Sequence, residues 1–192
     1  MKSKIITIAG DNVSGKSSVG KEVARMLEYK HYSAGDFARS LGTEKKMTID
    51  QIAVEAEKDA SIPYDELIDQ WVRDKAKEEK FVMDSRLGFH WLPKSFKVFL
   101  EIGIDVAANR AMKDLKENLN RSNSEHYRTL KEAREYLQRR SLADRTRYRE
   151  KYGIAYGDFE PYDLVINTGH SKNSIQTVSL LICNAYTDWI HK

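Results

Sequence analysis

The clearest chemical signal in the sequence is a glycine-bounded segment near the amino terminus. Residues 10–17, Gly-Asp-Asn-Val-Ser-Gly-Lys-Ser, fit the spacing G-x-x-x-x-G-K-[ST] at every fixed position. Glycines at this spacing let the backbone wrap closely around an anion and turn successive N–H groups toward it. The pattern therefore predicts a phosphate loop that binds a nucleoside triphosphate.

Side chains at the end of this phosphate loop add a charge and a metal ligand. Lys16 can reach the β- and γ-phosphates, and the Ser17 hydroxyl can bind Mg²⁺, which prefers oxygen ligands. A helix expected to begin near Lys16 directs its positive end toward the same anion. The predicted nucleotide-binding residues here are Gly10, Asp11, Asn12, Val13, Ser14, Gly15, Lys16, Ser17 and Ser18.

A second charged group lies toward the carboxyl terminus. Arg140, Asp144 and Arg147 are spaced i, i+4, i+7, so they share one face of a helix. Two guanidinium groups beside one carboxylate suit a ribose hydroxyl flanked by phosphates. The same spacing is also typical of an ordinary surface ion pair between Arg140 and Asp144.

Alternating strands and helices must position these groups. Apolar, β-branched runs predict strands at 4–9, 31–32, 81–84, 97–102 and 163–167. Helical periodicity predicts helices at 16–27, 50–54, 65–72, 105–117, 130–151 and 173–189. Residues 33–35 are expected to end the second strand, and the polar stretch 118–129 predicts a flexible loop. This alternation predicts an α/β fold with a mostly parallel sheet.

Composition limits the class of protein. The chain has 192 residues, which fits one domain, and its 32 Lys and Arg against 29 Asp and Glu leave a charge of +3. That balance argues against a general nucleic-acid coat, although residues 110–151 alone carry 13 basic and 7 acidic side chains. The single Cys183 fits a reducing compartment, and no apolar run is long enough for a membrane span. We expect a cytoplasmic monomer.

Five segments of the sequence resemble the cytidylate kinase family of nucleoside monophosphate kinases. Residues 32–39, Tyr-Ser-Ala-Gly-Asp-Phe-Ala-Arg, resemble its S-x-G-x-x-x-R acceptor-phosphate element, and 84–86, Asp-Ser-Arg, stand where it has D/E-G-R. Residues 140–147 are similar to its R-x-x-x-D-x-x-R element, while 148–153 and 162–168 look most like its short archaeal-type branch. The resemblance runs from Ile5 to about Thr168.

This resemblance implies a P-loop NTPase fold, a three-layer αβα sandwich around a five-stranded parallel sheet. It divides the chain into a core (1–35, 81–113 and 131–192), a helical acceptor-binding insertion (36–80) and a lid (114–130). It also implies ATP and Mg²⁺ as cofactors and a nucleoside monophosphate, with CMP or dCMP preferred, as the small-molecule acceptor. Closure of the mobile parts would exclude water, which otherwise competes as acceptor.

The resemblance also implies roles for individual residues. The implied catalytic residues are Lys16, Arg86, Arg140 and Arg147. The implied acceptor-binding residues are Ser33, Gly35, Arg39, Asp84, Arg86, Arg140, Asp144 and Arg147. Asp144 would bind the acceptor ribose, Ser17 and Asp84 would serve Mg²⁺ and its water shell, and Arg110 would stack on the donor adenine, with a surface arginine as the alternative.

Some residues depart from the family pattern and leave the acceptor open. Ser85 replaces the usual glycine of D-G-R, and Leu87 stands where bacterial-type enzymes have an aspartate that helps to read cytosine. Asp65, Asp69 and Ser61 are polar candidates for the base pocket, or else solvated helix residues.

Several alternatives remain at this point. AMP, UMP and dephospho-coenzyme A are other possible acceptors for the same chemistry. A different class would be a non-catalytic nucleotide-binding protein whose basic segment, 110–151, binds nucleic acid. We expect neither a nucleic-acid nor a membrane partner.

Overall fold

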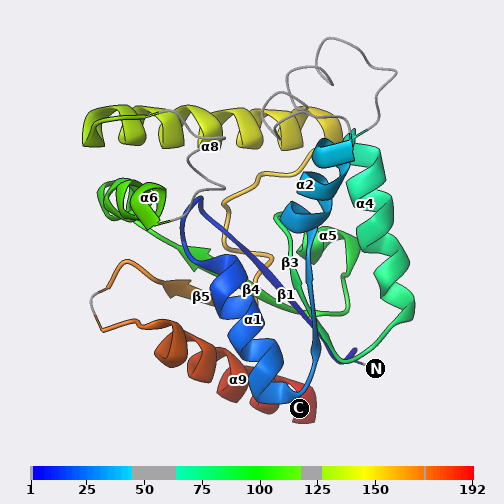
Figure 1. Cartoon of the computed structure of the whole chain (residues 1–192). Helices are drawn as coiled ribbons and strands as arrows, with labels where there is room; N and C mark the ends of the chain where they lie inside the picture. The colour runs from blue at the N-terminus through cyan, green and yellow to red at the C-terminus, as the bar shows by residue number, and fades with distance from the viewer. Residues whose placement is uncertain (1, 45–63, 118–126, 171) are drawn as a thin grey trace.

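The computed structural model of the chain describes residues 2–44, 64–117, 127–170 and 172–192. Within them a sheet lies at the centre and helices surround it, as Figure 1 shows. The predicted helix at 50–54 and most of the predicted loop at 118–129 lie outside the described residues.

The described part of the chain forms a five-stranded parallel sheet in the order β2-β3-β1-β4-β5. The strands are β1 (Ile5–Gly10), β2 (Lys30–Ser33), β3 (Phe81–Asp84), β4 (Phe96–Glu101) and β5 (Leu164–Asn167). All six residues of the central β1 are buried, as expected for a strand covered on both faces. The register pairs Ile8 with Asp84 and Asp84 with Ser33, so the ends of β2 and β3 lie beside the end of β1. The predicted α/β fold with a parallel sheet is confirmed.

Helices cover both faces and the carboxyl edge of this sheet. They are α1 (Lys16–Leu27), α2 (Ala34–Glu44), α4 (Tyr64–Asp74), the 3₁₀ turn η1 (Lys75–Lys77), α5 (Gly88–Trp91), α6 (Ile104–Glu117), α8 (Leu130–Tyr152) and α9 (Ile175–His191). Alternate residues of β1, Ile6 and Ile8, pack with Val23 of α1 and Ile182 of α9 in one buried cluster. Burying such side chains contributes about 1.5–3 kcal/mol each, which fixes the strand that leads into the phosphate loop.

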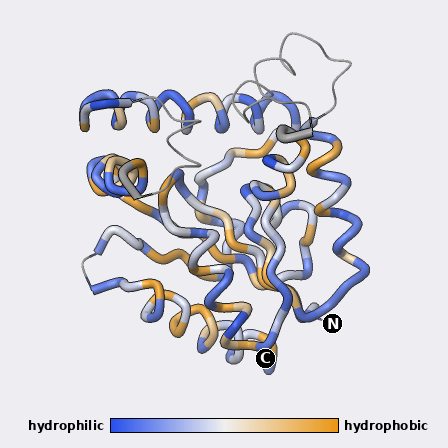
Figure 2. The backbone as a smooth tube through the Cα atoms, in the orientation of Figure 1, coloured by the Kyte–Doolittle hydropathy of each residue, from blue (hydrophilic) through white to orange (hydrophobic). Residues whose placement is uncertain are grey.

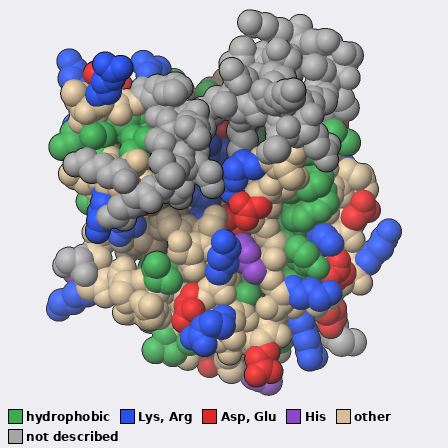
Figure 3. Space-filling model, viewed as in Figure 1, with side chains coloured by type: hydrophobic (Ala, Val, Ile, Leu, Met, Phe, Trp, Pro, Cys, Tyr) green, Lys and Arg blue, Asp and Glu red, His purple; other side chains and the backbone are tan. Residues whose placement is uncertain are grey.

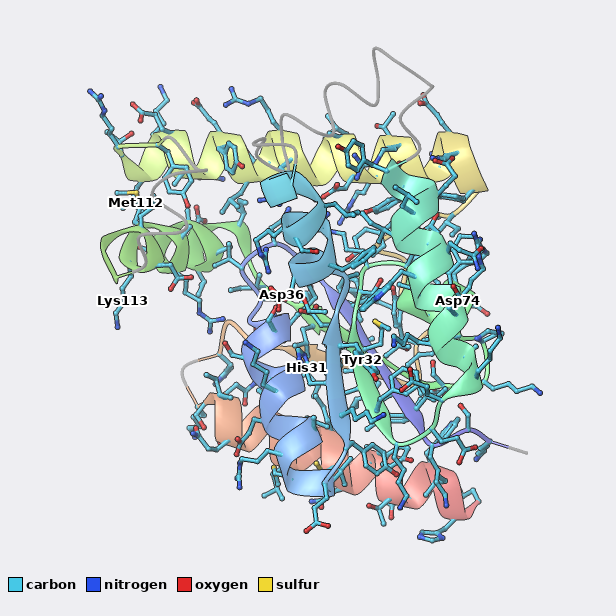
Figure 4. All side chains as sticks on the ribbon, turned by 45° about the vertical axis from the view of Figure 1, so that its right-hand side comes forward. His31, Tyr32, Asp36, Asp74, Met112 and Lys113 are labelled. Atoms are coloured by element: carbon cyan, nitrogen blue, oxygen red, sulfur yellow. The ribbon has the colours of Figure 1, made fainter. Side chains whose placement is uncertain are left out.

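The longest helix, α8, lies across the end of the molecule toward which β1 points (Figure 1). It is predominantly hydrophilic, whereas the strands are hydrophobic (Figure 2). Its buried residues include Ala133 and Leu137, which pack against small residues of α6 such as Ala108. Figure 4 shows Met112 of α6 directed toward α8 and Lys113 directed away from it. The packing against α6 therefore holds the amino-terminal half of α8 in place, although α8 is a very polar helix.

Acidic and basic side chains are interspersed over the lower half of the face in Figure 3. This distribution is typical of an ordinary solvated surface, where opposite charges lie near each other. None of the described helices is long and apolar enough to cross a lipid bilayer.

Most predicted boundaries agree with the structure within one or two residues. Residues 33–35 are an exception, because α2 begins at Ala34 directly after β2. The Ser33 hydroxyl accepts a hydrogen bond from the backbone N–H of Asp36 (3.2 Å), so it caps the helix that follows and no loop is needed. The four-residue α5 was not predicted, since it is too short for helical periodicity. The division into core, insertion and lid stays a prediction.

Candidate active site

The phosphate loop adopts a backbone that its glycines permit. Gly10 has φ of 148° and Gly15 has φ of 90°, both in the region that side chains disfavour. A Cβ at Gly10 would lie 2.3 Å from the carbonyl oxygen of Leu100 on β4. Gly15 is the N-cap of α1, so no side chain at that position competes for the first N–H groups of the helix. The loop therefore offers backbone donors to an anion.

Lys16 folds back onto the loop from which it projects. Its ammonium donates to the carbonyl oxygens of Gly10 (2.9 Å) and Asp11 (2.6 Å). Burial lowers its pKa to about 8, against the opposing effect of Asp84, and the positive charges of Arg86 and Arg140 lower it further. Arg86 and Arg140 are thus close enough to act on the ammonium, although they lie far away in the sequence.

The carboxylate of Asp84 gathers two hydroxyl groups at the end of β3. The Ser17 hydroxyl of α1 donates to its Oδ2, and the Ser33 hydroxyl of β2 donates to the same oxygen at 3.3 Å. A hydroxyl and a carboxylate held together are the oxygen ligands that Mg²⁺ prefers, with phosphates and water completing its shell. No group of three or more His, Cys, Asp or Glu among the described residues could hold a metal ion by itself. The residues present therefore fit a magnesium ion that arrives with a phosphate ligand.

Arg86 bridges the phosphate loop and α8. Its Nη2 donates to Oδ1 of Asn12 (2.8 Å), and the same nitrogen lies 3.1 Å from Oδ2 of Asp144. Burial alone would lower the pKa of the Arg86 guanidinium, but the Asp144 carboxylate and nearby tyrosines raise it above its ordinary value. The guanidinium is therefore always charged, and its two neighbours orient it.

The i, i+4, i+7 motif of α8 faces this bridge. Asp144 is buried, with 6% of its surface exposed, and also accepts from Nη2 of Arg147 (3.1 Å). The Nε of Arg147 is buried without a hydrogen-bond partner among the described residues, and it lies 3.8 Å from a carboxylate oxygen of Asp65 on α4. Arg140 is half-buried and acts electrostatically on Lys16. Asp144 is therefore not a surface residue, and the role of Arg140 stays a prediction.

The start of α2 places the acceptor-phosphate element beside Asp84. Arg39 pairs with Asp36 one turn earlier, and both side chains are about half exposed (56% each). Figure 4 shows Asp36 where α2 begins, next to the first turn of α1. A Cβ at Gly35 would lie 3.6 Å from the Arg39 guanidinium and 3.7 Å from the Ser33 hydroxyl. The absence of a side chain at Gly35 thus keeps space between these two polar groups.

Arg110 lies on α6, beside the end of β5. Its guanidinium donates to the side-chain hydroxyl of Thr168 at 3.4 Å and to the carbonyl oxygen of the same residue. The contact ties α6 to the segment that follows β5. Stacking of Arg110 on a donor base stays a prediction.

Ser85 and Leu87, which depart from the family pattern, are both buried. Leu87 packs with Phe89, Phe99 and Tyr148, so it offers no polar group to a base. A Cβ at Gly88 would lie 3.3 Å from the Cβ of Ser85. The missing side chain at Gly88 therefore makes room for the extra one at Ser85.

The polar candidates for a base pocket have different surroundings. Asp69 accepts from Nε1 of Trp91 (2.9 Å) and from the Tyr152 hydroxyl (2.5 Å). Burial raises the pKa of Asp69, while these two hydrogen bonds oppose the rise, so its carboxylate is engaged in packing α4 against α5 and α8. Asp65 instead lies beside Arg147 and Lys151, and Ser61 lies outside the described residues.

Sequence reasoning missed Tyr152 and Tyr156, which follow the helix motif. Tyr152 holds Asp69, and the Tyr156 hydroxyl bonds to the backbone of Gly10. Tyr152 lies in the segment 148–153 that resembles the family, but the resemblance gives it no role, and Tyr156 lies outside the quoted motifs. Aromatic residues near a helix end are usually read as core. Tertiary contacts alone reveal their positions.

Comparison with known proteins places the chain among its relatives. The pattern of the cytidylate kinase-like family matches residues 5–170, which include the phosphate loop and the α8 motif. The chain belongs to this family. It is 32% identical over 188 residues to a cytidylate kinase of Haloarcula marismortui, covering 95% of this chain and 91% of that one. The predicted resemblance and the expectation of a nucleoside monophosphate kinase are confirmed at this level.

Two further comparisons describe how widely the fold is used. A nucleotide dehydratase of Lacinutrix mariniflava that depends on S-adenosylmethionine is 31% identical over 170 residues, which are 88% of this chain and 33% of that protein. A crystal structure of shikimate kinase from Bacteroides thetaiotaomicron has a TM-score of 0.63 and 14% identity, over 98% of both chains. The second likeness confirms the α/β fold.

Proposed function

We propose that this family member transfers the γ-phosphoryl group of ATP to CMP or dCMP, producing ADP and CDP or dCDP. The position of Arg86 carries the proposal, because one guanidinium contacts Asn12 of the phosphate loop and Asp144 of α8. A donor bound at the loop and an acceptor bound at α8 would therefore meet at Arg86. The likeness to an archaeal cytidylate kinase supports the choice of acceptor.

The donor side consists of the phosphate loop and the side chains around it. The Lys16 ammonium donates to two loop carbonyls. A triphosphate offers stronger, charged acceptors, so Lys16 would move to the β- and γ-phosphates while α1 directs its N–H groups to them. Arg110, beside Thr168, would border the adenine.

The acceptor side is a group of polar side chains that we call the acceptor cluster. Its members are Ser33, Arg39, Arg86, Arg140, Asp144 and Arg147. We assign the acceptor phosphate to Ser33, Arg39 and Arg86, with Gly35 leaving room for it. Asp144 would accept hydrogen bonds from ribose hydroxyls, and Arg140 and Arg147 would lie between the acceptor phosphate and the transferred group.

Ser17 and Asp84 would hold Mg²⁺, directly or through its water shell. When bound, the ion would neutralise charge on the phosphates. Before it binds, Asp84 keeps Ser17 and Ser33 together, so the donor and acceptor sides share one carboxylate.

The chemical step needs positioning and positive charge rather than a general base. An oxygen of the acceptor phosphate forms a bond to the γ-phosphorus while the bond to the leaving ADP oxygen breaks. Near neutral pH the acceptor phosphate is already an anion, so no proton has to leave it. Lys16, Arg86, Arg140 and Arg147 would stabilise charge on the transferred group, which is how such sites lower the barrier.

The base preference rests on fewer residues. Leu87 is buried among apolar side chains, so the cytosine contact that an aspartate makes in bacterial-type enzymes must come from elsewhere. Among the described residues, Asp65 brings a carboxylate to the acceptor side of α8. A site that reads a base by hydrogen bonds discriminates strongly, because an unpaired buried polar group costs about 1–3 kcal/mol.

A coupled assay of ADP release tests the proposal. Common nucleoside and deoxynucleoside monophosphates and dephospho-coenzyme A are compared at fixed ATP and Mg²⁺, and CMP or dCMP should have the highest kcat/KM. A preference for AMP, UMP or dephospho-coenzyme A would refute the acceptor, and absence of turnover on every one would refute the transfer itself. Salt-sensitive binding to single strands without turnover would favour the nucleic-acid-binding alternative.

A further inference from the structure

Tyr156 connects the segment after α8 to the first glycine of the phosphate loop. Its side chain is buried, and its hydroxyl donates to the Gly10 carbonyl (2.8 Å) and accepts from the Gly10 N–H (3.2 Å). Both backbone groups of a single residue thus bond to one side-chain oxygen. Burial raises the pKa of Tyr156 well above its ordinary value, so the phenol stays neutral and can donate.

Gly10 is the residue at which the loop leaves the sheet. Its φ of 148° and its close approach to Leu100 exclude a side chain, so glycine is required there. Glycine is also the most flexible residue, which means that its conformation must be fixed by contacts with other residues. The Tyr156 hydroxyl supplies two such contacts.

The Gly10 carbonyl also accepts from the Lys16 ammonium at 2.9 Å. This carbonyl loses one donor when Lys16 moves to a bound triphosphate. The hydrogen bond from Tyr156 remains, so the carbonyl is not left unsatisfied in the nucleotide complex. An unsatisfied buried acceptor would oppose that movement of Lys16.

Tyr156 is itself held by α8. Its ring packs against Tyr148 at 5.5 Å between ring centroids and against Phe99 of β4 at 6.0 Å. Tyr148 follows Asp144 by one helical turn. The position of the loop is therefore coupled to the helix that carries half of the acceptor cluster.

We propose that Tyr156 is a positioning residue of the donor site, which fixes Gly10 so that Lys16 can exchange loop carbonyls for phosphate oxygens. The contribution of Tyr156 to catalysis rests on the proposed function. The same role also predicts a change in nucleotide affinity, which can be measured without any acceptor. Because the Tyr156 hydroxyl, and not its ring, bonds to Gly10, removing the hydroxyl alone would act on the ATP site and keep the contact of the ring with Tyr148 of α8.

The test compares Tyr156→Phe with the matched variant Tyr162→Phe. Both changes remove one buried hydroxyl from the same aromatic cluster, but the Tyr162 hydroxyl has no hydrogen-bond partner among the described residues. Calorimetry with ADP should give a Kd about tenfold higher for Tyr156→Phe, the size expected for a lost buried hydrogen bond. The KM for ATP should rise similarly with an unchanged KM for the acceptor, and Tyr162→Phe should stay within about twofold of the unmodified protein.

Urea unfolding of both variants separates positioning from stability. Equal ADP affinity in all three proteins would overturn the proposal, as would a loss of stability in Tyr156→Phe without a change in ADP affinity. Weaker ADP binding by Tyr156→Phe in a protein that turns over no monophosphate would support the positioning role while refuting the proposed function.

Discussion

The donor and acceptor sides of the site are built in different ways. The phosphate-binding part of the donor side comes from one continuous stretch, residues 10–18, and its interactions are mainly those of the backbone. Even Lys16 bonds to carbonyls of its own loop. The acceptor cluster joins β2, α2, the end of β3 and α8, and side-chain ion pairs hold much of it together.

This difference determines how each side can respond to a ligand. A backbone loop presents its N–H groups with little rearrangement, because turn geometry and glycine conformations set their directions. Ion pairs can be redistributed. Asp65 lies 3.8 Å from Arg147 and 3.4 Å from Lys151, so Lys151 can keep Asp65 paired when Arg147 turns toward a phosphate. The donor side is therefore preformed, and the acceptor side exchanges partners.

Removal of Arg86 should have the largest effect, because this residue belongs to both sides. In Arg86→Met, kcat should fall about thirty- to thousandfold, the equivalent of about 2–4 kcal/mol of transition-state stabilisation. The free energy of unfolding should also fall, since Asp144 is buried and would keep only one of its two arginine partners. Steady-state kinetics and urea unfolding measure the two effects.

Two variants sharpen this result. Arg149→Met removes an exposed arginine from α8 and should change kcat less than twofold. Arg86→Lys keeps the charge but cannot contact Asn12 and Asp144 with a planar fork, so it should restore only part of the activity. Full activity in Arg86→Lys would mean that charge alone matters and that the bridge does not.

A pH titration examines the donor side alone. The pKa of Lys16 is lowered from 10.5 to about 8, chiefly by burial. A triphosphate favours the charged ammonium, so binding takes up a proton above pH 8, and the Kd for ATP should rise by up to about tenfold per pH unit there. The unfolded chain keeps this proton up to a higher pH, so Lys16 should add stability as pH rises from 8 to 10.5.

Lys16→Arg is the comparison for this titration. Its guanidinium does not titrate in the range, so ATP binding should be weaker near neutral pH but without the dependence above pH 8. Calorimetric Kd values from pH 7 to 9.5 distinguish the two proteins. If the Kd values of the two proteins changed in parallel with pH, the pH dependence would come from a group other than Lys16.

The same contrast explains what could be predicted from sequence. The phosphate loop, α1 and β3 could be predicted from local sequence patterns. The glycine spacing sets the conformation of the loop, and the apolar patterns set those of the helix and the strand. The contacts of Arg86 could not be predicted, since Asn12 lies 74 residues away and Asp144 lies 58 residues away. Family resemblance predicted a role for one face of α8, and the structure places Asp144 of that face beside Arg86. The partners of Asp65, Asp69 and Tyr156 depend on how α4, α5 and α8 pack.

Asp65→Asn examines the acceptor side alone and should have a moderate effect. The variant removes the charge that Arg147 and Lys151 share, so the KM for the acceptor should rise about three- to tenfold while the KM for ATP stays unchanged. Glu66→Gln is the matched control, because Glu66 pairs with the same Lys151 but is half exposed (54%), and such pairs contribute little. Equal effects of both variants would contradict a specific role for Asp65.

Ser85→Gly should have the smallest effect on catalysis. It tests a residue between Asp84 and Arg86, where the donor and acceptor sides meet. Ser85 is buried, and the missing side chain at Gly88 accommodates its Cβ, so restoring the family glycine should change acceptor kcat/KM less than twofold. The unfolding free energy should fall by about 1 kcal/mol, because glycine gains more conformational freedom in the unfolded chain. Ser85→Ala separates the hydroxyl from the Cβ. A changed base preference in Ser85→Gly, measured across the nucleoside monophosphates, would show that Ser85 shapes the acceptor pocket after all.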